Sequence, residues 1–177
     1  CIIKELFEAP NTPVSKRVKN LFEQCYTFLA NNRSPHQAFV YDQVVSFGEL
    51  ISTSIVCAYL NHVGIAAEWV DARTCIKTDD FYRSAHLDWE RTQLAIQNQV
   101  QGNVLKITQG FIGSDDNNFT TTLGREGSDY SAAIFAYCLG ATDVTIWKDV
   151  PGVLNADPRV FHKTQLLHHI SYQEAIE

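Results

Sequence analysis

The sequence predicts an α/β fold, namely a three-layer α/β/α sandwich with a mainly parallel sheet. Segments typical of strands alternate with segments typical of helices, and the connections between them are short. A parallel sheet needs helices on both faces, and the apolar helices expected here can supply that cover. No internal repeat or linker divides the 177 residues, so we expect one domain over 1–177.

The first half of the chain carries two helical and two strand-like patterns. Apolar side chains three and four residues apart over 14–30 predict an amphipathic helix, which the polar run ending at Pro35 stops. Valine and aromatic residues over 39–45 predict a short strand. The elements expected next are a turn at 46–48, an apolar helix from Glu49 to about His62 and a strand over 65–71.

The second half continues this alternation. Residues 128–139 are apolar on almost every face, which predicts a covered helix with Ser128 as a good N-cap and Gly140 at its end. The other elements expected are loops or turns over 77–90, a helix around 89–100, a strand over 104–109, a strand over 144–147 and the start of a helix at 171–177.

Charge and composition exclude several classes of protein. Lysine and arginine number 14 against 20 aspartates and glutamates, a net charge of −6, which argues against a nucleic-acid partner. No apolar run seen in the sequence reaches the ~18–20 residues that span a bilayer, so no membrane partner is expected. The five cysteines are widely spaced, which fits neither a disulfide framework nor a zinc site and indicates a reducing, cytoplasmic compartment.

Three polar loops, at 46–49, 110–129 and 148–159, each follow an expected strand. In open α/β sheets ligands bind beyond the carboxyl ends of strands, and helix N-termini present N–H groups to anions. These loops are therefore candidate binding segments. The chain lacks both the P-loop pattern and the Gly-x-Gly-x-x-Gly pattern, which excludes a P-loop enzyme and disfavours a dehydrogenase.

The loop 110–129 holds the densest set of candidate residues. Gly124 and Gly127 allow a ligand to approach the backbone closely, and Arg125 has the planar fork that binds a carboxylate or a phosphate. A plainer interpretation is that Ser128 and Asp129 only cap a helix while Arg125 is a solvated surface residue. Local spacing leaves both interpretations open.

The other two loops contribute charged residues. Lys148 and Arg159 could meet phosphates, and Asp149 could orient a nucleotide or a magnesium-bound water. The alternative is an ordinary surface loop with charge pairs. Glu49 is expected at a helix N-terminus, where an acid is favourable without any ligand.

Five motifs, in the family's order, resemble the aspartate kinases of the amino-acid kinase superfamily. They are Ser-Phe-Gly-Glu-Leu-Ile-Ser-Thr at 46–53, Ile-Thr-Gln-Gly-Phe-Ile-Gly at 107–113, Thr-Thr-Thr-Leu-Gly-Arg-Glu-Gly-Ser-Asp-Tyr-Ser-Ala-Ala at 120–133, Ile-Trp-Lys-Asp-Val-Pro-Gly-Val at 146–153 and Ala-Asp-Pro-Arg at 156–159. The segment 65–80 looks most like the lysine-sensitive, single-function type.

This resemblance implies the amino-acid kinase fold and transfer of a phosphoryl group from ATP to the side-chain carboxylate of L-aspartate. The product would be 4-phospho-L-aspartate, in the first step of lysine, threonine and methionine biosynthesis. The nucleotide would carry Mg²⁺, and the full-length protein would be a homo-oligomer.

The same resemblance implies roles for particular residues. Glu49 would bind the α-ammonium group of aspartate and Arg125 one of its carboxylates, with Ser128 assisting. Arg125 would also take part in catalysis, together with Asp129, which would organise the charge of the site. The residues implied to bind the nucleotide are Gly110, Gly113, Lys148, Asp149, Leu154 and Arg159.

The chain also departs from the family's pattern. Glu126 stands where the family usually has glycine, Lys148 where threonine is common, and Leu154 where an aromatic is common. The Lys-Phe-Gly-Gly-Thr and Lys-Val-Leu-His-Pro motifs, which supply phosphate-facing lysines, lie outside this chain, as do the C-terminal regulatory ACT domains.

We interpret residues 1–177 as part of a longer polypeptide, incomplete at both ends. The sequence begins at Cys1 without methionine and stops at Glu177 inside a helical pattern. Without the lysine motifs, residues 1–177 are expected to show little or no kinase activity by themselves. The alternatives are another amino-acid or acyl-phosphate kinase of the superfamily and a non-catalytic, ligand-binding relative.

Overall fold

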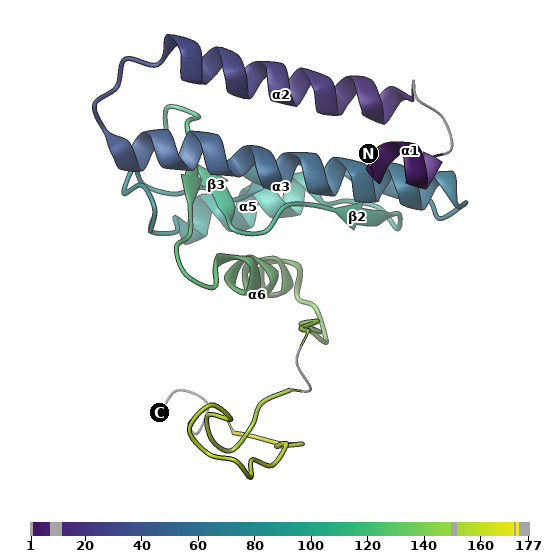
Figure 1. Ribbon diagram of the computed structural model, residues 1–177, viewed down its shortest axis with the longest axis vertical. Helices are drawn as coiled ribbons and strands as arrows, with labels where there is room; N and C mark the ends of the chain where they lie inside the picture. The colour runs from purple at the N-terminus through teal and green to yellow at the C-terminus, as the bar shows by residue number, and fades with distance from the viewer. Residues whose placement is uncertain (1, 8–11, 150–151, 172, 174–177) are drawn as a thin grey trace. The chain divides into compact units, whose positions relative to one another are not determined.

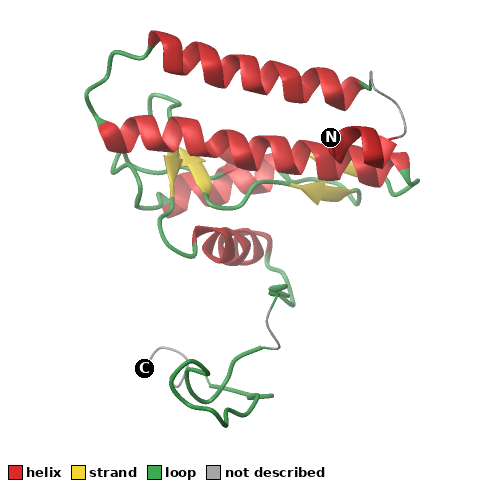
Figure 2. Cartoon of the chain, viewed as in Figure 1, coloured by secondary structure: helices red, strands yellow, loops and turns green. Residues whose placement is uncertain are grey.

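The computed structural model describes residues 2–7, 12–149, 152–171 and 173, and it divides into two compact units, Cys1–Val144 and Thr145–Glu177. All helices and strands assigned in the described residues belong to the first unit (Figure 2). In chain order they are α1 (Ile2–Phe7), α2 (Pro13–Asn31), α3 (Gln37–His62), β1 (Ala67–Trp69), α4 (Ala72–Cys75), α5 (Trp89–Gln99), β2 (Leu105–Ile107), β3 (Ile112–Ser114), β4 (Thr120–Thr122) and α6 (Gly127–Leu139).

The first unit is built in three layers, which confirms the expected sandwich. Helix α2 runs antiparallel to α3, and α3 covers one side of the strands (Figure 1). Leu50 of α3 packs there against Ala72 and Ile112. On the other side, α5 and α6 pack together, and Ile96 and Ile134 form a second core with residues that follow β1 and β4.

Helix α2 confirms the expectation for 14–30. Thr12 caps it, because its hydroxyl oxygen accepts the N–H of Ser15 at 3.2 Å, and Pro13 occupies the first helical position. Val14 and Val18 face α1 and α3 in a small core of their own. The polar residues after Asn31 end the helix, as expected.

Helix α3 overturns the expectations of a strand at 39–45, a turn at 46–48 and a helix beginning at Glu49. One helix of 26 residues runs through all three segments. Its buried positions lie four and three residues apart, so this face is enclosed by its neighbours and tertiary packing outweighs the strand propensity of the aromatic and β-branched residues. These buried positions are Asp42, Ser46, Leu50, Ser54 and Cys57.

The continuity of α3 also changes what its length implies. By length and composition alone, α3 could cross a membrane, a property that the strand and turn expected at 39–48 concealed. Its contacts are those of a core helix, since it packs against α1, α2, β1, β2 and β4. Its apolar composition is accounted for, in part, by these contacts.

Gly48 provides a test of this helix. It lies in the interior of α3, and a Cβ built on it meets no atom within 4 Å. We expect Gly48→Ala to raise the free energy of unfolding by about 0.5–1 kcal/mol, because alanine loses less backbone entropy in a helix. Chemical denaturation measures this change. Destabilisation would instead support the turn expected from the sequence.

The strands form two short sheets. β1 pairs in parallel with β2, with Trp69 opposite Ile107, which confirms both expected strands. β3 and β4 form an antiparallel hairpin within the segment 110–127 that was expected to be a loop. Helix α4 was not predicted, and the strand expected at 144–147 is wrong, since no described residue pairs with that segment.

Helices α5 and α6 confirm the expectations for 89–100 and 128–139. Gly140 ends α6 in the left-handed conformation, with φ of 63°. Ser128 is not the N-cap, however. Glu126 holds that position with φ of 55° and ψ of 22°, and it makes no side-chain cap.

The second unit is a compact loop structure among its described residues. Leu154 and Leu166 form an isolated antiparallel bridge, and the amide of Asn155 donates to the carbonyl of Gln165 at 3.0 Å. The helix expected at 171–177 falls almost entirely outside the described residues.

Candidate functional site

The carboxyl ends of β1 and β2 meet beside the middle of α3, and one buried amide joins all three elements. Gln109 follows β2 and is 1% exposed. Its Oε1 accepts the N–H of Ala72 at 2.8 Å, and its Nε2 donates to Thr53 Oγ1 of α3 at 2.8 Å. Thr53 in turn donates to the carbonyl of Glu49, one turn earlier. Glu49 is therefore fixed in register with the end of β2.

The next residue along the chain, Gly110, lies against the first turn of α6. A Cβ at Gly110 would come within 2.9 Å of Ser128 Cα. Phe111 follows with φ of 71°, a left-handed conformation unusual for a bulky residue, and its N–H donates to Ser131 Oγ at 2.9 Å. The N-terminal turn of α6 thus lies at the carboxyl end of β2, where its N–H groups favour an anion.

Glu49 is half-buried, and desolvation raises the pKa of its carboxyl group above the ordinary value. Among the residues that the structure describes, no cation or hydrogen-bond donor contacts this carboxylate. The expectation of a helix N-terminus was wrong, so the helix dipole does not account for an acid here. A partly desolvated carboxylate without a counter-charge is suited to binding an ammonium group.

Arg125 lies in the turn between β4 and α6, and its side chain is 95% exposed. Gly124 precedes it with φ of 80° and packs against Ser84, where a Cβ would lie 3.2 Å from Ser84 Oγ. Arg125 Nε lies 3.9 Å from a carboxylate oxygen of Glu126. The guanidinium group is therefore exposed, and a ligand from solution can reach it.

The structure brings four of the predicted site residues to one end of β2. Gly110 contacts Ser128, Asp129 follows in the first turn of α6, and Glu49 is linked to Gly110 through Thr53 and Gln109. Ser128 is exposed and Asp129 is half-buried. Arg125 lies two residues before this helix. The arrangement therefore includes an acidic side chain, Glu49, a basic side chain, Arg125, and the N-terminus of α6.

Gly113 is placed differently from the expectation of a phosphate-bordering turn. It is buried in β3, and a Cβ there would come within 2.9 Å of the carbonyl oxygen of Ile76. The close approach of the chain at 76–78 is enough to require glycine at this position. Gly110, in contrast, lies in the connection between β2 and β3.

The remaining predicted nucleotide residues, Lys148, Asp149, Leu154 and Arg159, belong to the second unit. Arg159 forms a two-pronged ion pair with Asp157, with Nε to Oδ1 at 3.1 Å and Nη2 to Oδ2 at 2.9 Å. This pair lowers the pKa of the Asp157 carboxyl group. Lys148 and Asp149 are exposed, and Leu154 is half-buried at the bridge to Leu166.

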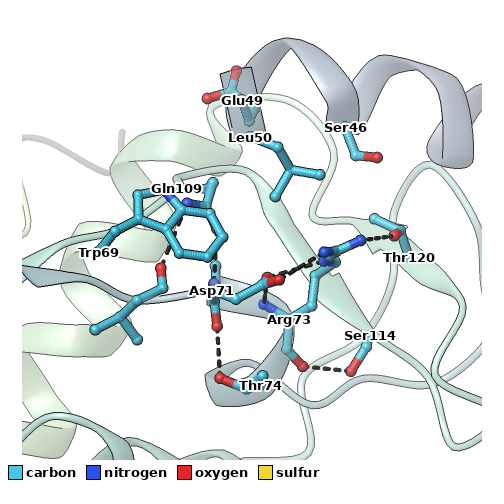
Figure 3. Close-up of polar contacts among 12 residues, drawn as sticks. Ser46, Glu49, Leu50, Trp69, Asp71, Arg73, Thr74, Gln109, Ser114 and Thr120 are labelled. Carbon is cyan, nitrogen blue, oxygen red and sulfur yellow. Dashed lines mark hydrogen bonds and ion pairs between the residues drawn. The ribbon is translucent and has the colours of Figure 1, made fainter. Parts of the chain in front are cut away.

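An ion pair beside the site was not predicted. Arg73 donates from Nε and Nη2 to the two carboxylate oxygens of Asp71, at 2.9 and 2.6 Å, and from Nη1 to Thr120 Oγ1 at 3.4 Å (Figure 3). Its carbonyl oxygen accepts from Ser114 Oγ at 2.7 Å. The pair joins the end of β1 to the β3–β4 hairpin. The sequence feature that could have indicated this ion pair is the two opposite charges, Asp71 and Arg73, at the end of an expected strand.

Glu126 occupies a backbone conformation that favours glycine, the residue that the resemblance leads one to expect here. Its left-handed backbone costs a non-glycine residue about 1–2 kcal/mol, which is why glycine suits this position. We expect Glu126→Gly to be more stable to denaturant than Glu126→Gln by about 1 kcal/mol, because both variants lose the charge but only glycine relieves the backbone strain.

The same two variants test the effect of the Glu126 charge. Both should lower the KM for a carboxylate substrate by about 1.4- to fivefold, since an exposed ion pair with Arg125 contributes about 0.2–1 kcal/mol. Equal stabilities of the two variants, or an unchanged KM, would contradict this account of the position.

Comparisons with known proteins show which family the chain resembles. The model of the amino acid kinase family matches residues 6–177. The chain is 35% identical to the lysine-sensitive aspartokinase 3 of Escherichia coli, over 99% of this chain and 39% of that protein. It is 39% identical to the chloroplastic aspartokinase 3 of Arabidopsis thaliana, over 77% of this chain and 25% of that protein.

A solved structure shows the same similarity in three dimensions. The crystal structure of E. coli aspartokinase III in complex with aspartate and ADP superimposes with a TM-score of 0.85 at 35% identity. The match covers 92% of this chain and 37% of that one. The chain therefore spans about two fifths of the length of this relative.

Proposed function

The chain belongs to the amino acid kinase family, and we propose that the protein it comes from transfers a phosphoryl group from ATP to the side-chain carboxylate of L-aspartate. The observation that carries this proposal is that two segments are both held at the carboxyl end of β2: the turn of α3 with Glu49, through Thr53 and Gln109, and the first turn of α6, through Gly110. The solved relative that superimposes on the chain was crystallised with aspartate and ADP.

The charges of the site fit an α-amino dicarboxylic acid. The uncompensated carboxylate of Glu49 would take the α-ammonium group, and the exposed fork of Arg125 would take a carboxylate in a bidentate contact. Ser128 would assist from the first turn of α6. A substrate held at both ends would present its remaining carboxylate for reaction.

The reaction requires little covalent chemistry from the protein. An oxygen of the substrate's side-chain carboxylate attacks the γ-phosphorus of ATP, a new P–O bond forms, and the bond to the β-phosphate oxygen breaks to release ADP. Catalysis then depends on positioning and on balancing the negative charge of the transferred group. We assign Arg125 and Asp129 to this task, with Asp129 orienting the charges around the helix N-terminus.

We propose nucleotide-binding roles for Gly110 of the first unit and, considered by themselves, for four residues of the second unit. Gly110 lies beside a helix N-terminus, which suits a phosphate. Gly113 is kept in the proposal only as part of the strand that supports this turn. The residues proposed from the second unit are Lys148, Asp149, Leu154 and Arg159.

Magnesium would accompany the nucleotide. The described residues include no group of three or more histidine, cysteine, aspartate or glutamate side chains suited to hold a metal ion. Asp149 is the residue of the nucleotide loop whose carboxylate could meet the hydrated ion. When bound, Mg²⁺ would neutralise charge on the phosphates. We also propose a cytoplasmic location and a homo-oligomeric full-length protein.

Two other functions make different predictions. A glutamate or carbamate kinase of the same family would use the same fold, but carbamate has no α-ammonium group for Glu49. A non-catalytic relative would bind aspartate without turnover. A coupled assay of ADP release by the full-length protein, with aspartate, glutamate and carbamate in parallel, separates the three.

We expect ADP release that depends on aspartate. Release with glutamate or carbamate alone would transfer the function to another kinase of the family. Calorimetric binding of aspartate with no ADP release would indicate the non-catalytic relative.

A further inference from the structure

A buried carboxylate on α3 lies outside the proposed substrate contacts. Asp42 is 0% exposed. Its Oδ2 accepts the N–H of Thr122 at 2.8 Å and the N–H of Arg83 at 2.9 Å, and its Oδ1 accepts the hydroxyl of Thr122 at 2.9 Å. Burial raises the pKa of Asp42, and these hydrogen bonds oppose that rise.

The position of Asp42 links the two proposed substrate-binding residues. Glu49 lies seven residues further along the same helix, which places the two residues on the same face. Thr122 ends β4, three residues before Arg125. The contact between Asp42 and Thr122 therefore joins the helix that carries Glu49 to the strand that leads into Arg125.

Neighbouring contacts make this link rigid. Gln43 exchanges two hydrogen bonds with the backbone of Thr120, to its carbonyl at 2.7 Å and from its N–H at 3.1 Å. The carbonyl of Thr122 accepts the N–H of Ala85 at 2.9 Å, so the end of β4 is held from both sides. Only the two residues Leu123 and Gly124 separate this anchored point from Arg125.

The free-energy cost of burying the Asp42 carboxylate indicates that this side chain does more than fill space in the core. Burying an ionised group is costly unless several hydrogen bonds offset the lost hydration, and an apolar side chain would fill the same space at lower cost. A carboxylate adds directional hydrogen bonds. The three that Asp42 accepts fix the register of α3 against β4 and against the chain at Arg83.

We propose that Asp42 is a positioning residue that sets the separation between Glu49 and Arg125 and so governs the binding of the amino-acid substrate. Asp42 does not touch the substrate in this account. The inference rests on the proposed aspartate kinase activity and adds to it a residue outside the binding contacts.

The chain offers a matched control in a second buried aspartate. Asp115 is 3% exposed and also accepts three hydrogen bonds, from the amides of Asn117 and Phe119 and from the hydroxyl of Tyr82, each at 2.9 Å. These partners lie in the β3–β4 turn and the 79–86 loop, without a contact to α3 from this carboxylate. Asp115→Asn should therefore cost stability without moving Glu49 relative to Arg125.

The experiment compares Asp42→Asn with Asp115→Asn in the full-length protein. We expect Asp42→Asn to raise the KM for aspartate by at least about tenfold while the KM for ATP stays within about twofold, because small displacements of binding groups carry effects of this size. Asp115→Asn should leave both KM values within about twofold of wild type. Denaturant unfolding of both variants measures the stability change separately.

A milder variant covers the case in which Asp42→Asn fails to fold. Thr122→Val removes one of the three donors to Asp42 and keeps the side chain's shape. It should raise the KM for aspartate, but not for ATP, by a smaller factor than Asp42→Asn does. In the double variant with Asp42→Asn and Thr122→Val, the rise in the KM for aspartate should be smaller than the product of the two single rises.

The outcomes separate this inference from the proposed function. Wild-type protein that does not phosphorylate aspartate overturns the proposed function and this role with it. Wild-type activity combined with equal changes in the two KM values, or with a KM for aspartate in Asp42→Asn no different from that in Asp115→Asn, overturns the positioning role alone. If only Thr122→Val folds, an unchanged KM for aspartate in that variant overturns it as well.

Discussion

Replacing Arg125 with alanine in the full-length protein is expected to raise the KM for aspartate by about 10–150-fold, the equivalent of losing a charge-assisted hydrogen-bonded contact of about 1.5–3 kcal/mol. The KM for ATP should change little. Because the side chain is 95% exposed and lies 3.9 Å from the carboxylate of Glu126, the free energy of unfolding should also change little. Steady-state kinetics in both substrates and denaturant unfolding measure these quantities.

Two further variants define what the Arg125 result means. Arg125→Lys should recover little of the loss, since an ammonium group cannot reproduce two parallel hydrogen bonds. Arg91→Ala is the control, because Arg91 is a half-exposed arginine of α5 whose ion pairs with Asp88 and Asp116 lie outside the site. Arg91→Ala should leave both KM values unchanged. A KM for aspartate unaffected by Arg125→Ala would remove Arg125 from the substrate site.

The helices with a clear periodic pattern were predictable from sequence. Helices α2 and α6 carry their own signals, apolar side chains three and four residues apart in the first and Gly140 at the end of the second. The parallel strands β1 and β2 were also found, because each is a short apolar run that ends in polar residues. Local signals were enough for these elements because neighbours reinforce what the local sequence favours.

The errors have a common physical origin. The first part of α3 contains valine and aromatic residues that favour strands, and Gly48 suggested a turn, yet packing against α2 on one side and β1 and β4 on the other stabilises one continuous helix. The strands of the β3–β4 hairpin have only three residues each, and all of these residues are buried. No alternation of polar and apolar side chains therefore indicates the hairpin in the sequence.

The site was predictable only in part. The placement of Gly110 and Ser128 after a strand and at a helix start followed from the sequence, whereas the roles of Glu49 and Arg125 followed from resemblance. The contact between Asp42 and Thr122 spans 80 residues. No local pattern marks such a pair, because only the folded chain brings its two members together.

The turn at Gly110 carries the second large expected effect. A Cβ at this position would come within 2.9 Å of Ser128 Cα and 3.0 Å of Ser128 Cβ and Oγ. The Cα atom belongs to the backbone of α6, so rotation of a side chain cannot relieve the overlap. Gly110→Ala must therefore separate the end of β2 from the first turn of α6 by a few tenths of an ångström or more.

This displacement should act on catalysis more than on folding. The first turn of α6 holds Ser128 and Asp129, and β2 is linked through Gln109 and Thr53 to the turn of α3 that carries Glu49. Misplacing a reacting group by about 1 Å can lower the rate by about 10²-fold, and a shift of a few tenths of an ångström lowers it by a smaller factor. We therefore expect Gly110→Ala to lower kcat/KM by about 10–100-fold in full-length protein, and overpacking to cost about 1–3 kcal/mol of stability.

Gly48→Ala is the matched control, because it adds the same methyl group one residue from Glu49 but into open space. It should keep kcat/KM while stabilising α3. Circular dichroism and denaturant unfolding establish that Gly110→Ala is folded under the assay conditions. A folded Gly110→Ala protein with wild-type kcat/KM would show that the contact between Gly110 and Ser128 is not part of the site, and the proposed phosphate position beside the N-terminus of α6 would then be wrong.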